Sequence, residues 1–165
     1  MSLWTLDFRA LEWLFPILVT LHNSEEAIWL PGWWKRTGLR RVPVAPRVFR
    51  FAAVVLTFLA YAITWLSVRA GQQSLWTYLV FGCIAATLVN VLVPHLAATI
   101  ATRSYVPGVA TAVFLNLPVL TLLVVDALRE GYVSGGKAMA FCAGVTAALV
   151  AFIPALFRLG KVLTF

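Results

Sequence analysis

Charged residues are scarce in this sequence. They make up only 12% of its 165 residues, while 62% are hydrophobic, whereas a soluble domain has about 25% charged residues. This balance excludes a soluble globular protein, and the length is that of a single domain covering residues 1–165. Cysteine is scarce too: Cys83 and Cys142 fall in separate apolar runs, which favours neither a disulfide framework nor a zinc finger.

Long apolar runs are what the sequence has instead. The hydrocarbon core of a bilayer is about 30 Å thick and needs about 20 apolar residues per helix. Four runs approach or exceed this length, and a fifth of the right length is interrupted by a polar block from His22 to Glu26. We therefore predict an all-α integral membrane bundle of about five transmembrane helices, spanning residues 11–30, 51–68, 76–101, 109–125 and 138–157.

The net charge of +7 is explained by where the basic residues fall. With the N-terminus outside and five crossings, the inner side collects nine basic residues: Lys35, Arg36, Arg40, Arg41, Arg47, Arg50, Arg103, Arg158 and Lys161. The outer side keeps Arg9, Arg69, Arg129 and Lys137. This positive-inside asymmetry predicts a multi-pass protein of the inner cell membrane, N-out and C-in, with no nucleic-acid partner. The connection from Pro31 to Arg50 is expected to lie on the inner leaflet and to contact membrane lipids.

The polar block of the first predicted helix is a candidate site. A charge at the bilayer centre costs at least about 2.5 kcal/mol on insertion scales. Polar residues in a spanning helix are therefore more often functional than the same residues in a soluble helix. At about 100° per residue, Glu25 and Glu26 flank His22 by about 60° and 40°. The three side chains suit either a His–carboxylate pair for proton transfer or ligands of a divalent metal. In a structural alternative, the glutamates only pair with basic residues at the interface.

A second polar group lies in the third predicted helix. Pro94 leaves the carbonyl of Asn90 without its helical donor, directly beside His95. Asn90 lies about 140° from His95 on an ideal helix and converges with it only if the proline distorts the turn. In the predicted topology, both histidines lie about 10 Å below the inner surface, with Tyr105 in the short loop above them. Asn116, in the fourth predicted helix, is expected to hydrogen-bond a neighbouring helix.

The pattern His22-Asn-Ser-Glu25-Glu26 resembles the HXXEE family of small integral membrane proteins, which is named for it. The block from Asn90 to His95, followed by Tyr105-Val-Pro-Gly108, is similar to a second segment of that family. The resemblance implies a membrane enzyme of unassigned chemistry and indicates no substrate.

These observations predict a membrane enzyme that acts on a lipid or another hydrophobic small molecule. The candidate catalytic residues are His22, Glu25, Glu26, His95, Asn90 and Tyr105, and the candidate metal ligands are His22, Glu25, Glu26 and His95. The reaction is either metal-assisted, with zinc or iron as the divalent ion, or a metal-free acid–base isomerisation or hydrolysis. A proton-coupled transporter and a non-enzymatic lipid-binding protein are the alternatives, and the oligomeric state is left open.

Overall fold

The computed structural model describes residues 7–38 and 44–163, which form helices and no strand. The elements are α1 (Phe8–Leu11), α2 (Leu14–Thr37), α3 (Pro46–Ala70), α4 (Leu75–Asn90), the π-helical η2 (Val91–Leu96), α5 (Ala97–Thr102), α6 (Val109–Thr111), the π-helical η3 (Ala112–Asn116), α7 (Leu117–Arg129) and α8 (Gly135–Leu163). The prediction of an all-α fold is confirmed.

Four helices are long and apolar enough to cross a membrane: Pro46–Ala70, Leu75–Thr102, Val109–Arg129 and Gly135–Leu163. Each contains one of the four uninterrupted runs predicted from the sequence. The fifth run falls mainly on α2, which has 24 residues but contains the polar block. Because that block lowers its hydropathy, α2 is not among the four helices that meet the criterion by composition.

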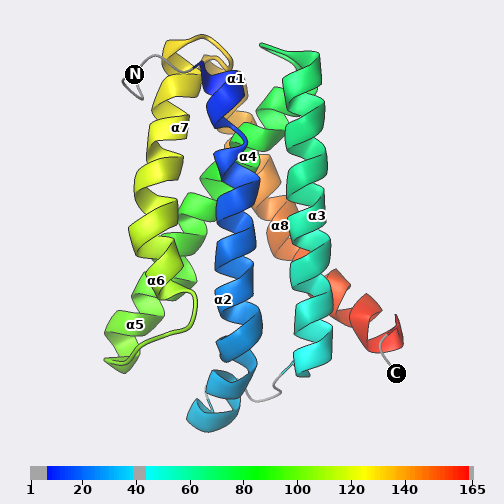
Figure 1. Ribbon diagram of the computed structural model, residues 1–165, viewed down its shortest axis with the longest axis vertical. Helices are drawn as coiled ribbons and strands as arrows, with labels where there is room; N and C mark the ends of the chain where they lie inside the picture. The colour runs from blue at the N-terminus through cyan, green and yellow to red at the C-terminus, as the bar shows by residue number, and fades with distance from the viewer. Residues whose placement is uncertain (1–6, 39–43, 164–165) are drawn as a thin grey trace.

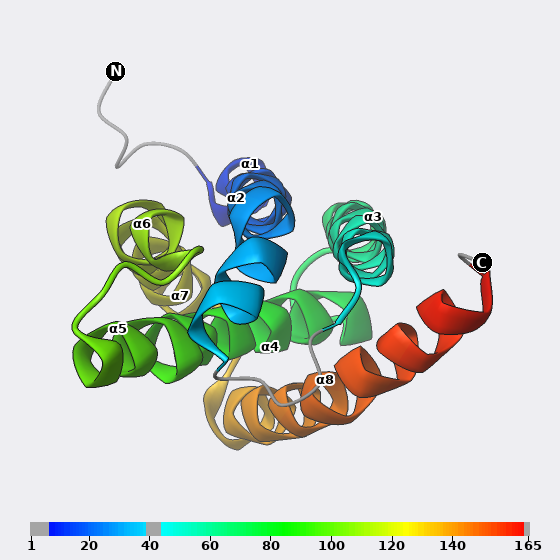
Figure 2. The same ribbon diagram turned by 90° about the horizontal axis from the view of Figure 1, so that it is seen from below.

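The long helices run alternately up and down, so α1 and the C-terminal end of α8 lie at opposite ends of the bundle (Figure 1). Seen along the bundle, α2 lies between α3 on one side and α6 and α7 on the other, with α4 and α5 crossing below them in the view (Figure 2). The outermost layer is α8, which packs on α4. A Cβ atom on Gly82 of α4 would lie 2.7 Å from Val145 Cγ2, so the absence of a side chain there permits this close helix packing.

Two apolar clusters pack at different levels of α2. One includes Phe15 and Leu18 from its first half, and the other includes Leu30 and Trp33 from its second half. The polar block lies between these clusters. Packing above and below therefore holds the polar side chains inside the bundle.

The connection between α2 and α3 is shorter than the sequence indicated. Helix α2 continues through Pro31 to Thr37 and ends at Gly38, whose φ is +65°, and α3 already begins at Pro46. Pro31 has no N–H to offer the carbonyl of Ala27, but Arg50 Nε donates to that oxygen at 3.3 Å. This replacement explains why the helix does not stop at the proline. Residues 39–43 of the predicted loop lie outside the described residues.

Candidate metal centre

Helix α2 directs His22, Glu25 and Glu26 of the polar block toward the segments that follow α4. His22 is 4% exposed and Glu25 is 7% exposed, and the side chain of Glu26 is 17% exposed. The helical phase predicted from the sequence therefore places all three side chains largely inside the bundle. They do not share one set of partners, however, because Glu25 binds a loop while His22 and Glu26 face the second histidine.

The π-helical segment η2 brings Asn90 and His95 to the same side. Val93 departs from helical geometry, with φ −134° and ψ 117°, immediately before Pro94. As a result, Asn90 Nδ2 lies 3.3 Å from His22 Nε2, while His95 Nε2 lies 3.2 Å from Glu26 Oε1. The distortion that the sequence analysis required for Asn90 to converge with His95 is present.

His22, Glu26 and His95 form a three-residue group with the composition of a metal site. The imidazole rings of His22 and His95 meet edge to face, with centroids 4.7 Å apart. His22 Nε2 lies 3.9 Å from Glu26 Oε1, and one ligand atom from each of the three residues lies within 4.8 Å of the others. Ligands about 2.1 Å from a tetrahedral zinc are roughly 3.4 Å apart, so small side-chain movements would close the group around one ion.

Glu25 has a different environment, formed by the loop between α5 and α6. Its Oε1 accepts hydrogen bonds from the Tyr105 hydroxyl and from Gly108 N, the latter at 2.7 Å. Its Oε2 accepts from Thr111 N at 3.0 Å and from Thr111 Oγ1 at 2.7 Å. Four donors directed at one carboxylate stabilise its anionic form. Glu25 therefore has its oxygens engaged by the loop and is not part of the three-residue group.

Thr111 links the Glu25 carboxylate to His22. Its hydroxyl lies 2.9 Å from His22 Nδ1. Because the single hydroxyl proton is donated to Glu25, the oxygen must accept from His22, which places the imidazole proton on Nδ1. Nε2 then carries the lone pair, which agrees with Asn90 Nδ2 donating to it. The network thus leaves His22 Nε2 as the basic atom facing the group.

Gly108 closes the group from the loop side. Its φ is +96°, and a Cβ atom built on it would lie 2.9 Å from His95 Nδ1 and 3.1 Å from Glu26 Cγ. Both the left-handed backbone and the close approach therefore require glycine. Neither ring nitrogen of His95 forms a hydrogen bond within the described residues, so the contact with Glu26 is the polar contact of that imidazole.

Tyr105 lies at the edge of the site rather than in it. Partial desolvation, followed by the hydrogen bond to Glu25 and the charge of Glu25, raises the pKa of Tyr105 to about 12. Its hydroxyl therefore stays protonated at neutral pH and acts as a donor to Glu25.

The other predicted polar residue, Asn116, is 1% exposed, and its amide atoms have no hydrogen-bond partner within the described residues. The expected hydrogen bond to a neighbouring helix is therefore absent from the described residues.

A cavity of about 350 Å³ adjoins Glu26 and His95. Most of its lining is apolar, and Thr102 is its other polar residue. The lining residues are Glu26, Leu30, Trp33, Trp34, Pro94, His95, Ala98, Ala101, Thr102 and Val106. Two potential ligands thus form the polar end of a mainly hydrophobic space.

Six site residues are predicted from the sequence, and the structure divides them into two connected groups. His22, Glu26 and His95 come together with Asn90 in contact, whereas Glu25 and Tyr105 bind each other. Thr111 and Gly108, which connect and shape the groups, were not predicted as functional residues. In the sequence, these two residues are marked by no more than their spacing, a glycine followed three residues later by a threonine at the start of a helix.

Comparison with known proteins places these residues in a family. A family model described as "Protein of unknown function with HXXEE motif" matches residues 13–123, a range that includes every residue of the two groups. The uncharacterized protein YrkK of Bacillus subtilis (strain 168) is 32% identical over 146 residues, covering 88% of this chain and 92% of YrkK. No solved structure matches the chain. The chain belongs to the HXXEE-motif family of proteins of unknown function.

Proposed function

We propose that this protein is a multi-pass enzyme of the inner cell membrane, with its N-terminus outside and its C-terminus in the cytoplasm. Four helices of sufficient length and apolarity support the membrane location, and α2 is the fifth crossing in this arrangement. The opposite placement of α1 and the C-terminal end of α8 in the bundle agrees with an odd number of crossings (Figure 1). The excess of lysine and arginine at the end that carries the α2–α3 connection supports the orientation.

The enzyme uses a divalent metal held by His22, Glu26 and His95. The observation that carries this proposal is the convergence of three ligand atoms within 4.8 Å. Two imidazoles and one carboxylate are the ligand set of His₂Glu zinc hydrolases and of non-haem iron sites, and both types keep a position open for water or substrate. Asn90 Nδ2 donates to His22 Nε2 in the structure, and a bound ion would take the place of this hydrogen bond.

Glu25 and Thr111 are positioning residues in this proposal. Histidine ligands commonly donate their second N–H to a carboxylate or carbonyl, which fixes the tautomer and increases the basicity of the ligating nitrogen. Here, the Nδ1–H of His22 reaches the Glu25 carboxylate through the hydroxyl of Thr111. The chain Glu25–Thr111–His22 therefore prepares Nε2 for a metal.

The substrate is a lipid or another hydrophobic small molecule that enters the cavity beside Glu26 and His95. Tryptophan, leucine, valine and alanine side chains line this cavity, and such surfaces suit an apolar ligand with one reacting polar group. A bound divalent metal would polarise that group and lower the pKa of a bound water. Neither lysine nor arginine lines the cavity, which favours a substrate without a negative charge.

Metal analysis of the purified protein tests the proposal. After loading with zinc or ferrous iron and removal of free metal, about one ion per chain is expected. His22→Ala, Glu26→Gln and His95→Ala are expected to lose it, while Ser24→Ala, whose hydroxyl bonds the Thr20 carbonyl instead, retains it. Lipid profiling of a deletion strain complemented with each variant then tests activity: the three ligand variants should accumulate the same hydrophobic compound as the deletion.

A metal-free acid–base reaction is the second candidate, favoured by the 3.2 Å contact between Glu26 and His95. In that case, Glu26→Gln and His95→Ala would accumulate the compound although the wild-type protein binds neither zinc nor iron. That combination would overturn the metal proposal and retain the enzyme. Ligand variants that complement as well as the wild-type protein would overturn both.

A further inference from the structure

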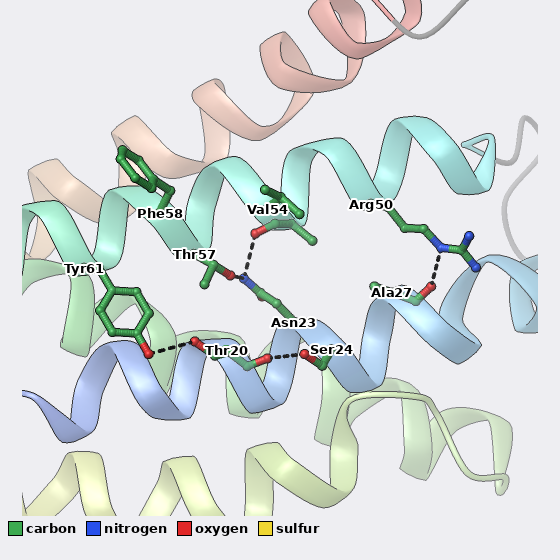
Figure 3. Close-up of a pocket in the computed structure, with 10 residues that line it drawn as sticks. Thr20, Asn23, Ser24, Ala27, Arg50, Val54, Thr57, Phe58 and Tyr61 are labelled. Atoms are coloured by element: carbon green, nitrogen blue, oxygen red, sulfur yellow. Dashed lines mark hydrogen bonds between the residues drawn. The ribbon is translucent and has the colours of Figure 1, made fainter.

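A groove of about 480 Å³ runs between α2 and α3 (Figure 3). Its lining residues are Thr20, Asn23, Ser24, Ala27, Arg50, Ala53, Val54, Thr57, Phe58 and Tyr61. None of these belongs to the three-residue group or to the Glu25 network. The groove is therefore a separate feature that the proposed reaction does not use.

Most of the polar atoms in the groove floor are satisfied by the protein itself. Asn23 Nδ2 donates to Ala53 O at 3.3 Å and to Thr57 Oγ1 at 2.8 Å, which ties α2 to α3. Ser24 Oγ donates to Thr20 O at 2.6 Å (Figure 3). The outer wall is apolar and open, with Val54 68% exposed and Phe58 72% exposed. Such a surface suits a hydrocarbon chain rather than a polar ligand.

Arg50 provides the one charge of the groove, at the end near the α2–α3 connection. Its Nε is used by the Ala27 carbonyl, and Figure 3 shows the rest of the guanidinium extending beyond that bond. Arg50 is exposed, and no carboxylate lies within ion-pair distance of it in the described part of the chain. Arg47, one turn earlier, and Lys35 and Arg36, in the last turn of α2, add positive charge at the same end.

The length of the groove matches one leaflet. Arg50 and Tyr61 mark the ends of its α3 side and are eleven residues apart, a rise of about 16 Å. Half of a hydrocarbon core of about 30 Å is about 15 Å. An acyl chain that begins at Arg50 would thus reach Tyr61 near the middle of the bilayer.

We propose that this groove binds an anionic phospholipid, with one acyl chain against Val54 and Phe58 and the phosphate paired with Arg50. A guanidinium forms paired hydrogen bonds with phosphate oxygens. The cluster of cations at this end favours a headgroup with a net negative charge over a zwitterionic one. The inference depends on the membrane location but not on the metal centre.

Lipid binding to the purified protein in detergent tests the inference. The probes are phosphatidylglycerol, phosphatidylcholine with identical chains, and glycerol phosphate, each followed by native mass spectrometry. Phosphatidylglycerol should bind most tightly, and glycerol phosphate, which lacks the chains, should not bind. Arg50→Gln keeps a donor for Ala27 but loses the charge, so phosphatidylglycerol should bind about tenfold more weakly, as expected for one charge-assisted contact. Arg47→Gln is the matched control and should change binding less.

Val54→Trp provides a second test that leaves Arg50 in place. Filling the groove should weaken binding of both phospholipids, while the metal content stays unchanged. Equal binding of the two phospholipids, or equal losses in Arg50→Gln and Arg47→Gln, would overturn the proposal. Should Arg50→Gln fail to fold, unchanged phosphatidylglycerol binding by Val54→Trp would overturn it. Retention of metal by the ligand variants, with lipid binding as expected, would overturn only the proposed function.

Discussion

The imidazole rings of His22 and His95 meet at an angle of 88°, with centroids 4.7 Å apart, although α2 provides one and the π-helical η2 the other. A third segment, the loop before α6, brings the Gly108 backbone against His95 and binds Glu25. The centre therefore depends on three segments that are distant in the sequence. Substitutions in any of them should change metal binding in ways that distinguish ligands from supporting residues.

Thr111→Val should weaken metal binding without removing a ligand. The substitution deprives His22 Nδ1–H of its acceptor and Glu25 of one donor, both at hydrogen-bond distance in the structure. Loss of such an outer partner typically lowers metal affinity about 10- to 100-fold. The Kd for zinc, measured by competition with a chromophoric chelator, should rise by that factor.

Thr111→Ser should restore affinity because it keeps the hydroxyl. Thr121→Val is a control for the loss of a helical threonine, since within the described residues Thr121 Oγ1 bonds the Leu117 carbonyl alone. Equal affinities of Thr111→Val and Thr111→Ser would show that the hydroxyl does not position His22.

Gly108→Ala should both destabilise the protein and displace His95. A left-handed backbone costs a non-glycine residue about 1–2 kcal/mol, and the new Cβ would also lie 2.9 Å from His95 Nδ1. We expect a lower Tm in detergent together with loss of bound metal.

Gly131→Ala separates these two effects. Gly131 also has a positive φ, of +73°, but no heavy atom lies within 4 Å of a Cβ at that position. It should therefore lower the Tm through backbone strain and keep its metal. Retention of full metal content by Gly108→Ala would mean that the loop does not hold His95 in place.

The positions of the long helices could be predicted because length and apolar composition are sufficient to define a spanning segment. The four uninterrupted runs could be located without knowing which helices lie beside them. The end of α2 could not be predicted in this way. Pro31 is a helix-ending signal, and the donor that compensates for it, Arg50 Nε, comes from another helix.

The candidate site could be predicted in part for a similar reason. The scarcity of polar residues in apolar runs and a common predicted depth pointed to His22, Glu25, Glu26 and His95 as one group, and the structure brings His22, Glu26 and His95 together. The separate role of Glu25 could not be predicted, because two of its four donors are backbone N–H groups of Gly108 and Thr111. Backbone donors leave no residue-type signature in a sequence.

Tyr105→Phe should have a smaller effect than Thr111→Val. It removes one hydrogen bond from Glu25 but leaves the other three donors in place, so the rise in Kd for zinc should stay below about tenfold. The substitution also allows the pKa of the Tyr105 phenol to be measured. Because the pKa of Tyr105 is raised from 10.0 to about 12, the wild-type minus variant difference in phenolate absorbance should develop near pH 12. A difference that develops near pH 10 would mean that the phenol does not donate to Glu25.

The contact between Asp7 and Glu130 should make the attachment of α1 depend on pH. Burial acts to raise the pKa of Asp7, but hydrogen bonds from Tyr132 and Glu130 outweigh it and lower the pKa below 3.8. Burial raises the pKa of Glu130 above 4.5, and the hydrogen bond and charge of Asp7 add to this, although the Phe8 N–H acts to lower it. Asp126 and Arg9 are the other charged groups that act on this pair.

The signs of these shifts define the pH at which α1 is held most firmly. A carboxyl group with a lowered folded pKa stabilises the fold above its unfolded pKa, and one with a raised folded pKa stabilises it below its unfolded pKa. Both contributions are therefore present between about pH 3.8 and 4.5. The stabilisation by Asp7 is lost as the pH falls through the folded pKa of Asp7. The stabilisation by Glu130 is lost as the pH rises through the folded pKa of Glu130.

Amide exchange at Phe8, whose N–H donates to Glu130 Oε2 at 2.9 Å, measures this attachment. Its protection factor, corrected for the intrinsic rate at each pH, should fall between pH 4.5 and pH 7. Glu130→Gln is neutral throughout and offers Asp7 an amide donor, so it should abolish this fall. Asp126→Asn removes a nearby charge but keeps the pair and should retain the fall. A pH dependence that persists unchanged in Glu130→Gln would exclude proton sharing between Asp7 and Glu130 as its cause, because the glutamine side chain does not titrate.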